Sequence, residues 1–286
     1  MKGSKQSLAG IIAILGVAAL WGGTFTAMKS AFSSADPMPF LFVRFIFSLV
    51  SLAIILKLMG RRPRFSSMGI LAGILVFFGY ALQMEGLTGI SATKAAFITG
   101  LNAPMVPLLE FIIFRRKPTH NSLLAMLVGV LGLSLLTGAI HGIPLSRGDL
   151  LTLLCALAWA LQIVIVDRAV KGLDPLDLTI NQAVPTLVLS GMAIPIMNEW
   201  DIPLNITVLS AALYTGILAT TAAFFLQAWA QERIPPESAA LGLMGEPMFA
   251  YLFSWLLLGE ILTPIQVLGA LLILASIPLA TKDSVR

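Results

Sequence analysis

Residues 239–260 read AALGLMGEPMFAYLFSWLLLGE, and this stretch decides the class of fold. A helix of this length crosses the hydrocarbon core of a bilayer, which is about 30 Å thick. Glu246 and Pro247 lie near its middle. A carboxylate that faces lipid costs about 2.5–3.5 kcal/mol, and a proline removes a helical hydrogen bond and usually kinks the helix. We therefore expect both residues to face protein or a water-filled cavity.

A second stretch has the same design. Residues 95–117 read AAFITGLNAPMVPLLEFIIFRRK and contain Pro104 and Pro107. Interrupted membrane helices are tolerated where they line a cavity, and they form the substrate sites of many secondary transporters. We interpret the two stretches as broken helices of this kind, with the prolines as the predicted break or hinge positions.

The composition supports a polytopic α-helical membrane protein. Hydrophobic residues make up 58% of the 286 residues and charged residues only 11%, whereas soluble domains are about 45–50% apolar and about 25% charged. The single cysteine, Cys155, lies within an apolar stretch, which excludes an internal disulfide and a cysteine metal cluster. We therefore predict an all-α fold with no cofactor and no metal.

Ten apolar segments are long enough to be spans, and the loops between them are short. The expected spans are Leu8–Phe32, Pro37–Leu58, Ser67–Leu87, Thr93–Phe114, Leu123–Ile140, Asp149–Val170, Pro175–Met197, Ile206–Ala230, Ser238–Leu258 and Pro264–Ala280.

The distribution of Lys and Arg predicts the orientation in the membrane. Fourteen of these residues fall on the side that holds both termini and three on the other, and Arg44 lies within a span. Positive charge collects in cytoplasmic loops, so we expect both termini in the cytoplasm and the chain in the cell membrane, the inner membrane of a bacterium. The net charge of +4 is explained by these loops and does not indicate nucleic-acid binding.

Several residues recur at a nearly fixed offset. Trp21 and Trp159 are 138 residues apart, and Gln83 and Gln227 are 144 apart. This pattern predicts two repeats, 1–145 and 146–286, that form one transport domain. Each half holds five spans, an odd number, so the second half must insert in the opposite direction. Inverted repeats place a substrate site near the middle of the membrane, at their interface.

The sequence also resembles a known group of transporters. The run LWGGTF at residues 20–25, the Asp-Pro starts of the second and seventh spans, the Glu246-Pro247 pair and the ending LLLGE at residues 256–260 are similar to the drug/metabolite transporter superfamily, EamA type. Gly100 and Pro107 fit a glycine-x6-proline pattern of its fourth helix, so Gly100 joins the predicted hinge positions. The size fits the YddG-like amino-acid exporters of that superfamily. The resemblance implies export of amino acids or similar small metabolites.

Polar, aromatic and methionine side chains inside the spans are the candidate cavity residues. Glu246 is the strongest, as a carboxylate that binds a substrate amine or a proton; the alternatives are a structural cap or an ion pair with Arg44. The amides also have a structural interpretation, as interhelical hydrogen bonds, and the tryptophans as core packing. The predicted cavity residues are Trp21, Tyr80, Gln83, Asn102, Trp159, Gln162, Tyr214, Gln227, Met244 and Glu246.

Other classes of protein fit the sequence less well. The dipeptide Gly-Lys never occurs, so there is no phosphate-binding loop of the Walker type and we expect no ATP drive. An enzyme would need a nucleophile with a base, paired aspartates or a metal set within the membrane, and the spans show none. We expect a monomeric secondary transporter that works by alternating access. The alternatives are a facilitative channel or pore for small solutes and a drug-efflux carrier.

Overall fold

The computed structural model describes residues 2–115, 120–138, 140, 144–201, 205–234, 239, 242–243 and 245–281. Side chains are described for these residues except 2–8, 114, 122, 126 and 277–281. Met244 lies outside the described residues.

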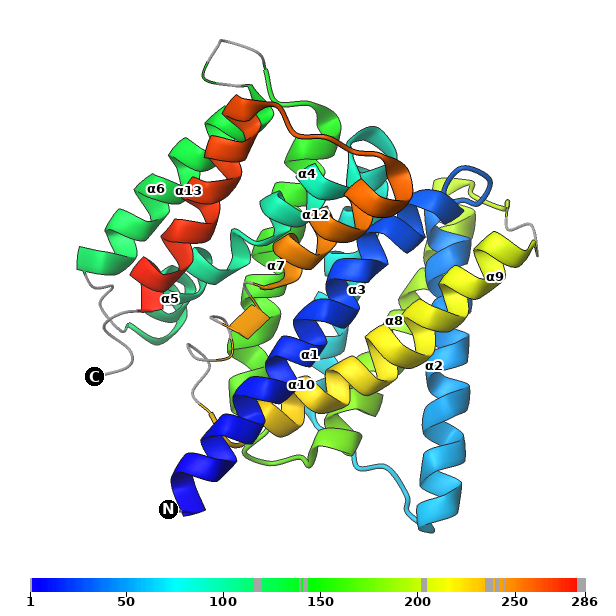
Figure 1. Cartoon of the computed structure of the whole chain (residues 1–286). Coiled ribbons are helices and arrows are strands. Elements are labelled where there is room, and N and C mark those ends of the chain that lie inside the picture. The colour runs from blue at the N-terminus through cyan, green and yellow to red at the C-terminus, as the bar shows by residue number, and fades with distance from the viewer. Residues whose placement is uncertain are drawn as a thin grey trace.

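The fold is all-helical, and the described ranges contain no β-strand (Figure 1). The helices of the region before residue 146 are α1 (Lys2–Ala31), α2 (Pro37–Met59), α3 (Ser67–Gly89), α4 (Ala92–Thr99), α5 (Asn102–Phe114) and α6 (His120–Thr137). Those that follow are α7 (Arg147–Ala169), α8 (Pro175–Met197), α9 (Ile206–Leu213), the π-helical segment η2 (Tyr214–Ala222), α10 (Ala223–Gln231), α12 (Gly245–Leu258) and α13 (Pro264–Thr281).

Seven helical segments of the described chain are long and apolar enough to cross a membrane. Two of them are composite, because α4 with α5 and α9 with η2 and α10 each make one span. Two shorter apolar helices, Leu123–Thr137 and Pro264–Ser276, lie in the fifth and tenth expected spans. Helix α12 lies in the ninth expected span, in which residues 239, 242 and 243 are also described as helical. The multi-pass class is confirmed; ten spans in two inverted repeats remain a prediction.

The two Asp-Pro pairs begin α2 and α8, as their sequence predicts. Pro37 and Pro175 occupy the first helical position, where a missing backbone donor costs nothing. Asp174 caps α8 by accepting hydrogen bonds from the amides of Leu176 and Asp177, at 3.0 and 3.1 Å. Asp36 makes no such cap. Its carboxylate instead accepts the amides of residues 200 and 201, which follow α8.

The predicted break in the fourth expected span is present, and it lies just before the prolines. Helix α4 ends at Thr99 and α5 begins at Asn102, so the break falls at Gly100 and Leu101. Pro104 is the third residue of α5, and Pro107 lies inside that helix. Amides of a first helical turn have no partner within the helix, so proline is tolerated there without a kink. A kink at Pro247 within its span remains a prediction, because residues 242 and 243 are helical and residue 244 lies outside the described residues.

Glycines allow the closest helix crossings. In Figure 1, α6 and α13 lie side by side at one edge of the bundle. A Cβ added at Gly132 would lie 2.7 Å from the carbonyl oxygen of Gly269, and the reverse distance is also 2.7 Å. Lipid gives helices no hydrophobic reason to associate, so close approach at small residues supplies the packing energy.

The two broken regions meet at the centre of the bundle. Helix α4 contacts α12, and α12 packs along α1. A Cβ added at Gly100 would lie 3.1 Å from the Cγ atom of Pro247. A glutamate after the end of α12 adds a further link, because the carboxylate of Glu260 accepts the amides of Ala92 and Thr93 at the start of α4, both at 2.9 Å. The breaks therefore form one structural centre, beside which the cavity lies.

Candidate functional site

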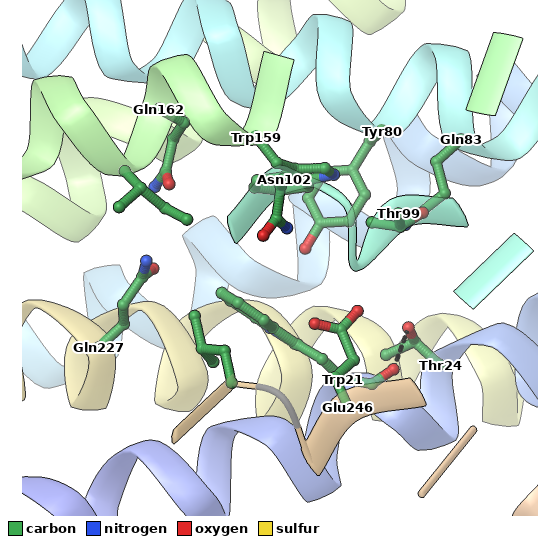
Figure 2. Close-up of a pocket in the computed structure, with 12 residues that line it drawn as sticks. Trp21, Thr24, Tyr80, Gln83, Thr99, Asn102, Trp159, Gln162, Gln227 and Glu246 are labelled. Carbon is green, nitrogen blue, oxygen red and sulfur yellow. Dashed lines mark hydrogen bonds between the residues drawn. The ribbon is translucent and has the colours of Figure 1, made fainter. Parts of the chain in front are cut away.

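A cavity lies between two groups of helices at this centre (Figure 2). Helices α3 and α7 form one wall, and α1, α10 and α12 form the other. The lining residues are Trp21, Thr24, Tyr80, Gln83, Thr99, Asn102, Trp159, Gln162, Ile163, Gln227, Leu243 and Glu246. Eight of the ten predicted cavity residues are therefore brought together, although they come from six different expected spans of the chain.

Aromatic rings form one side of the cavity. The ring centroids of Trp21 and Trp159 are 6.0 Å apart, and those of Tyr80 and Trp159 are 4.9 Å apart. Phe224 contacts all three rings from behind. The Trp21 indole donates a hydrogen bond of 2.8 Å to the carbonyl oxygen of Ala219 in η2. The rings are thus fixed by packing and by a buried hydrogen bond, which makes a rigid apolar surface.

Amide side chains supply most of the polar lining. No described residue forms a hydrogen bond with the side chain of Gln83, Asn102 or Gln227. Gln162 donates 2.7 Å to Gln182, but its buried oxygen has no partner within the described part of the chain. Since a buried amide without a partner costs free energy, these groups are suited to bind water or a ligand.

Glu246 is the acidic group of the cavity. It is the second residue of α12 and is 9% exposed, and its carboxylate points toward Asn102 and Tyr80 across the cavity (Figure 2). The described residues donate no hydrogen bond to this carboxylate and form no ion pair with it. The site is therefore ready for a cationic or hydrogen-bonding group of a ligand.

Arg44 lies behind the aromatic wall and is fully buried. Its Nε donates to the hydroxyl of Thr220 at 2.9 Å, and its Nη2 donates to the hydroxyl of Tyr80 at 2.7 Å. The guanidinium also lies 4.0 Å from the centroid of the Tyr80 ring. These contacts replace the ion pair with Glu246 that the sequence suggested. Arg44 therefore supports the cavity through Tyr80.

Two predicted cavity residues are not placed there. The hydroxyl of Tyr214 donates a hydrogen bond of 2.6 Å to the carbonyl oxygen of Leu20, and Tyr214 lines a separate hollow beside α1. Met244 falls outside the described residues. The predicted hinge residues Gly100, Pro104, Pro107 and Pro247 do not line the cavity, although Gly100 and Pro247 contact each other beside it.

Sequence reasoning missed four lining residues, Thr24, Thr99, Ile163 and Leu243. Small hydroxyl and aliphatic side chains occur on every face of these helices, so they carry no signal of their own. Phe224 was also missed. It lies 144 residues after Tyr80, the same offset that separates Gln83 from Gln227, so the repeat pattern contained a signal for it.

The cavity is narrow. The volume open to the centre of a water molecule is about 20 Å³, while the empty space inside its walls is about 400 Å³ with the open solvent at its mouth included. The smaller value decides occupancy, because it counts only space that a molecule can enter, and it corresponds to about one water. A metabolite therefore requires the walls to move apart.

The fold and the cavity together define a multi-pass membrane protein of the transporter class. The model of the EamA-like transporter family matches residues 8–138 and 146–281, and the chain belongs to this family. It is 31% identical to an uncharacterized transporter of Archaeoglobus fulgidus, over 96% of this chain and 88% of that protein. It is 27% identical to the uncharacterized transporter YoaV of Bacillus subtilis, over 93% and 94% of the two chains.

A solved structure has the same fold. A protein of known crystal structure superposes with a TM-score of 0.70 at 18% identity, covering 97% of this chain and 98% of that one. The family and the curated relatives identify a membrane transporter.

Proposed function

We propose that this chain is a secondary transporter that exports amino acids or similar small metabolites through the cavity between its two halves. The observation that carries the proposal is the carboxylate of Glu246, which is nearly buried and has no donor among the described residues. An ammonium group of a substrate would supply the missing hydrogen bonds and charge. The amides of Gln83, Asn102 and Gln227 would hold the polar remainder, and the rings of Trp21 and Trp159 its apolar part.

The division of the lining supports a site between two inverted halves. Six lining residues precede residue 146 and six follow it. The same family model matches both halves separately. Equivalent positions also pair across the centre: Trp21 contacts Trp159, and Tyr80 contacts Phe224. A two-fold relation of this kind lets each half move against the other while the site stays at their interface.

Alternating access is the mechanism that this arrangement favours. The cavity holds about one water, so binding a metabolite requires the helices to separate. The contact between Gly100 and Pro247 joins the two broken helices, and movement there would widen the space beside Glu246. A channel or pore is the second candidate, and a carrier for drugs is the third.

Uptake into proteoliposomes tests the proposal. Liposomes loaded with one unlabelled amino acid are diluted into the labelled one, across a panel of amino acids. A transporter shows saturable counterflow, whereas a channel passes solute without exchange. Absence of saturable flux for every amino acid and related small metabolite would contradict the proposed substrate class.

The Glu246→Gln variant tests the site. It keeps the shape of the side chain and removes the charge, which lowers the affinity for an amine by about tenfold to hundredfold, since a hydrogen bond to a charged group contributes about 1.5–3 kcal/mol. Asp167→Asn is the matched control, because Asp167 pairs with Lys171 at the end of α7 and does not line the cavity. Wild-type flux in well-folded Glu246→Gln would exclude this role.

The driving force is open to a direct measurement. Among the described residues, Glu246 is the one acidic residue that lines the cavity, and it is therefore the one candidate proton carrier there. For this reason we expect counterflow to run on the substrate gradient alone. Proton antiport is the alternative. The same counterflow is measured with and without a pH gradient, and strict dependence on that gradient would favour proton coupling.

A further inference from the structure

A second hollow lies on the outer surface of the bundle, away from the cavity. It is an apolar groove of about 730 Å³ between the end of α2, the start of α8 and the segment formed by η2 and α10. Its walls include exposed apolar side chains: Ile55 is 37% exposed, Met59 54%, Ile217 38% and Phe225 37%. Because the surrounding helices span the membrane, these side chains face lipid.

The groove is as deep as one leaflet. Its lining on α2 extends from Ser51 to Met59, a separation of eight residues that corresponds to a rise of about 12 Å along the helix. The hydrocarbon of one leaflet is about 15 Å thick. The groove therefore has the depth of a single acyl chain, from the headgroup level toward the middle of the membrane. The bias of Lys and Arg assigns this end to the cytoplasmic leaflet.

Charged side chains of both signs surround the mouth. Arg61 binds Asp174 and Asp177, the latter at 3.4 Å. Arg233 donates to Glu232 at 2.9 Å and lies 4.0 Å above the ring of Trp229. The side chains of Arg61, Asp174, Glu232 and Arg233 are 29–40% exposed, so each retains capacity to bind another group.

The charged side chains at the mouth of the groove determine which lipid headgroup fits there. The lining of the mouth holds two guanidinium groups and two carboxylates, so positive and negative charge are equal there. A headgroup with only a phosphate would pair with the guanidinium groups and offer nothing to the two carboxylates. A headgroup with a phosphate and a primary ammonium pairs with both signs, and the ammonium donates hydrogen bonds that a quaternary choline lacks.

From the groove and its rim together, we propose that this surface is a binding site for phosphatidylethanolamine. One acyl chain lies in the groove, the phosphate contacts the arginines, and the ammonium contacts Glu232 and Asp174. The wall of the groove includes Thr221 of η2. The same segment accepts the Trp21 hydrogen bond through Ala219, so the lipid touches an element that also positions the cavity.

Native mass spectrometry of the purified full chain tests the proposal. The protein is mixed with equal amounts of phosphatidylethanolamine, phosphatidylcholine and phosphatidylglycerol that carry the same acyl chains. We expect the ethanolamine lipid to be retained about threefold to tenfold over the other two, the range given by partly exposed charge pairs. Equal retention of the three lipids, or preference for the glycerol lipid, would overturn the proposed headgroup.

Variants locate the bound lipid. Glu232→Gln removes a carboxylate from the mouth, and we expect it to abolish the preference for ethanolamine over choline. Ala222→Phe fills the groove and lowers retention of all three lipids; Ile55→Trp narrows the groove from α2 and provides the same test if the first variant does not fold. Ala53→Phe is the matched control, because Ala53 is exposed on α2 outside the groove. An unchanged preference in Glu232→Gln and in a folded groove-filling variant would place the lipid elsewhere.

Discussion

The crossing of α1 and α12 beside the cavity gives the sharpest test of the packing. A Cβ added at Gly22 would lie 2.6 Å from the Cβ of Phe249 and 2.8 Å from the carbonyl oxygen of Glu246. Ordinary contacts begin at 3.4 Å, so Gly22→Ala forces a separation of up to 0.8 Å (3.4 − 2.6). Overpacking of this kind costs about 1–3 kcal/mol, while alanine recovers up to about 1 kcal/mol of helix propensity.

We therefore expect Gly22→Ala to lose up to about 2 kcal/mol of stability. The thermal midpoint of the purified protein in detergent measures this loss. Proteoliposome counterflow measures a second effect, a lower substrate affinity, because the clash displaces the backbone of Glu246. Gly132→Ala creates an equally close contact at the α6 and α13 crossing, 2.7 Å from the carbonyl oxygen of Gly269. This variant lowers the midpoint and leaves the affinity unchanged.

Gly16→Ala is the matched control on the same helix, since an added Cβ there meets no atom within 4 Å. It retains or raises the midpoint. If Gly22→Ala matches Gly16→Ala in both measurements, α1 and α12 are not packed as closely as described, and the position assigned to Glu246 is wrong.

Three further predictions concern single contacts. Tyr80→Phe leaves the buried guanidinium of Arg44 without one acceptor and lowers stability by about 1–3 kcal/mol in thermal unfolding; an unchanged midpoint would refute this contact. Burial is the largest single effect on Asp174 and disfavours its ionisation, but the hydrogen bond and charge of Arg61, together with the amides of Leu176 and Asp177, lower its pKa overall. A carboxyl group whose pKa is lower in the folded state stabilises the fold at pH values above its pKa in the unfolded chain. The difference in stability between wild type and Arg61→Gln should therefore vanish as the pH falls below about 4, through the pKa of Asp174 in the folded protein. A difference that stays constant with pH would contradict the pairing. With Cys155→Ala as background, a cysteine added at either terminus should react with a membrane-impermeant maleimide from the cytoplasmic side, and labelling from opposite sides would refute the inverted topology.

The apolar helices and the starts of α2 and α8 were predictable because their causes are local. Apolar length specifies each span, and the Asp-Pro pairs specify where α2 and α8 begin. The mid-span polar residues were also a sound guide, since lipid makes an unpaired amide or carboxylate unfavourable on the outer surface. For this reason Gln83, Asn102 and Glu246 all line the cavity.

Partner choice was not predictable in the same way. Arg44 and Glu246 are both charged residues within spans, and the sequence alone therefore suggested an ion pair between them. The structure pairs Arg44 with Tyr80 and Thr220 instead. Tyr214 was likewise predicted to line the cavity, yet its hydroxyl donates a hydrogen bond to the carbonyl oxygen of Leu20 in α1. The rotation of each helix about its own axis decides which neighbours Arg44 and Tyr214 meet. That rotation depends on contacts between segments that are distant in the sequence.

By itself, the sequence determined that the chain is helical, crosses a membrane several times and carries polar groups within its spans. The tertiary structure alone decided that the break after Thr99 meets the start of α12 and that the aromatic rings of both halves close over one narrow space. The physical reason is that burial in lipid acts on each residue separately, whereas a cavity exists only where several helices fail to fill the space between them.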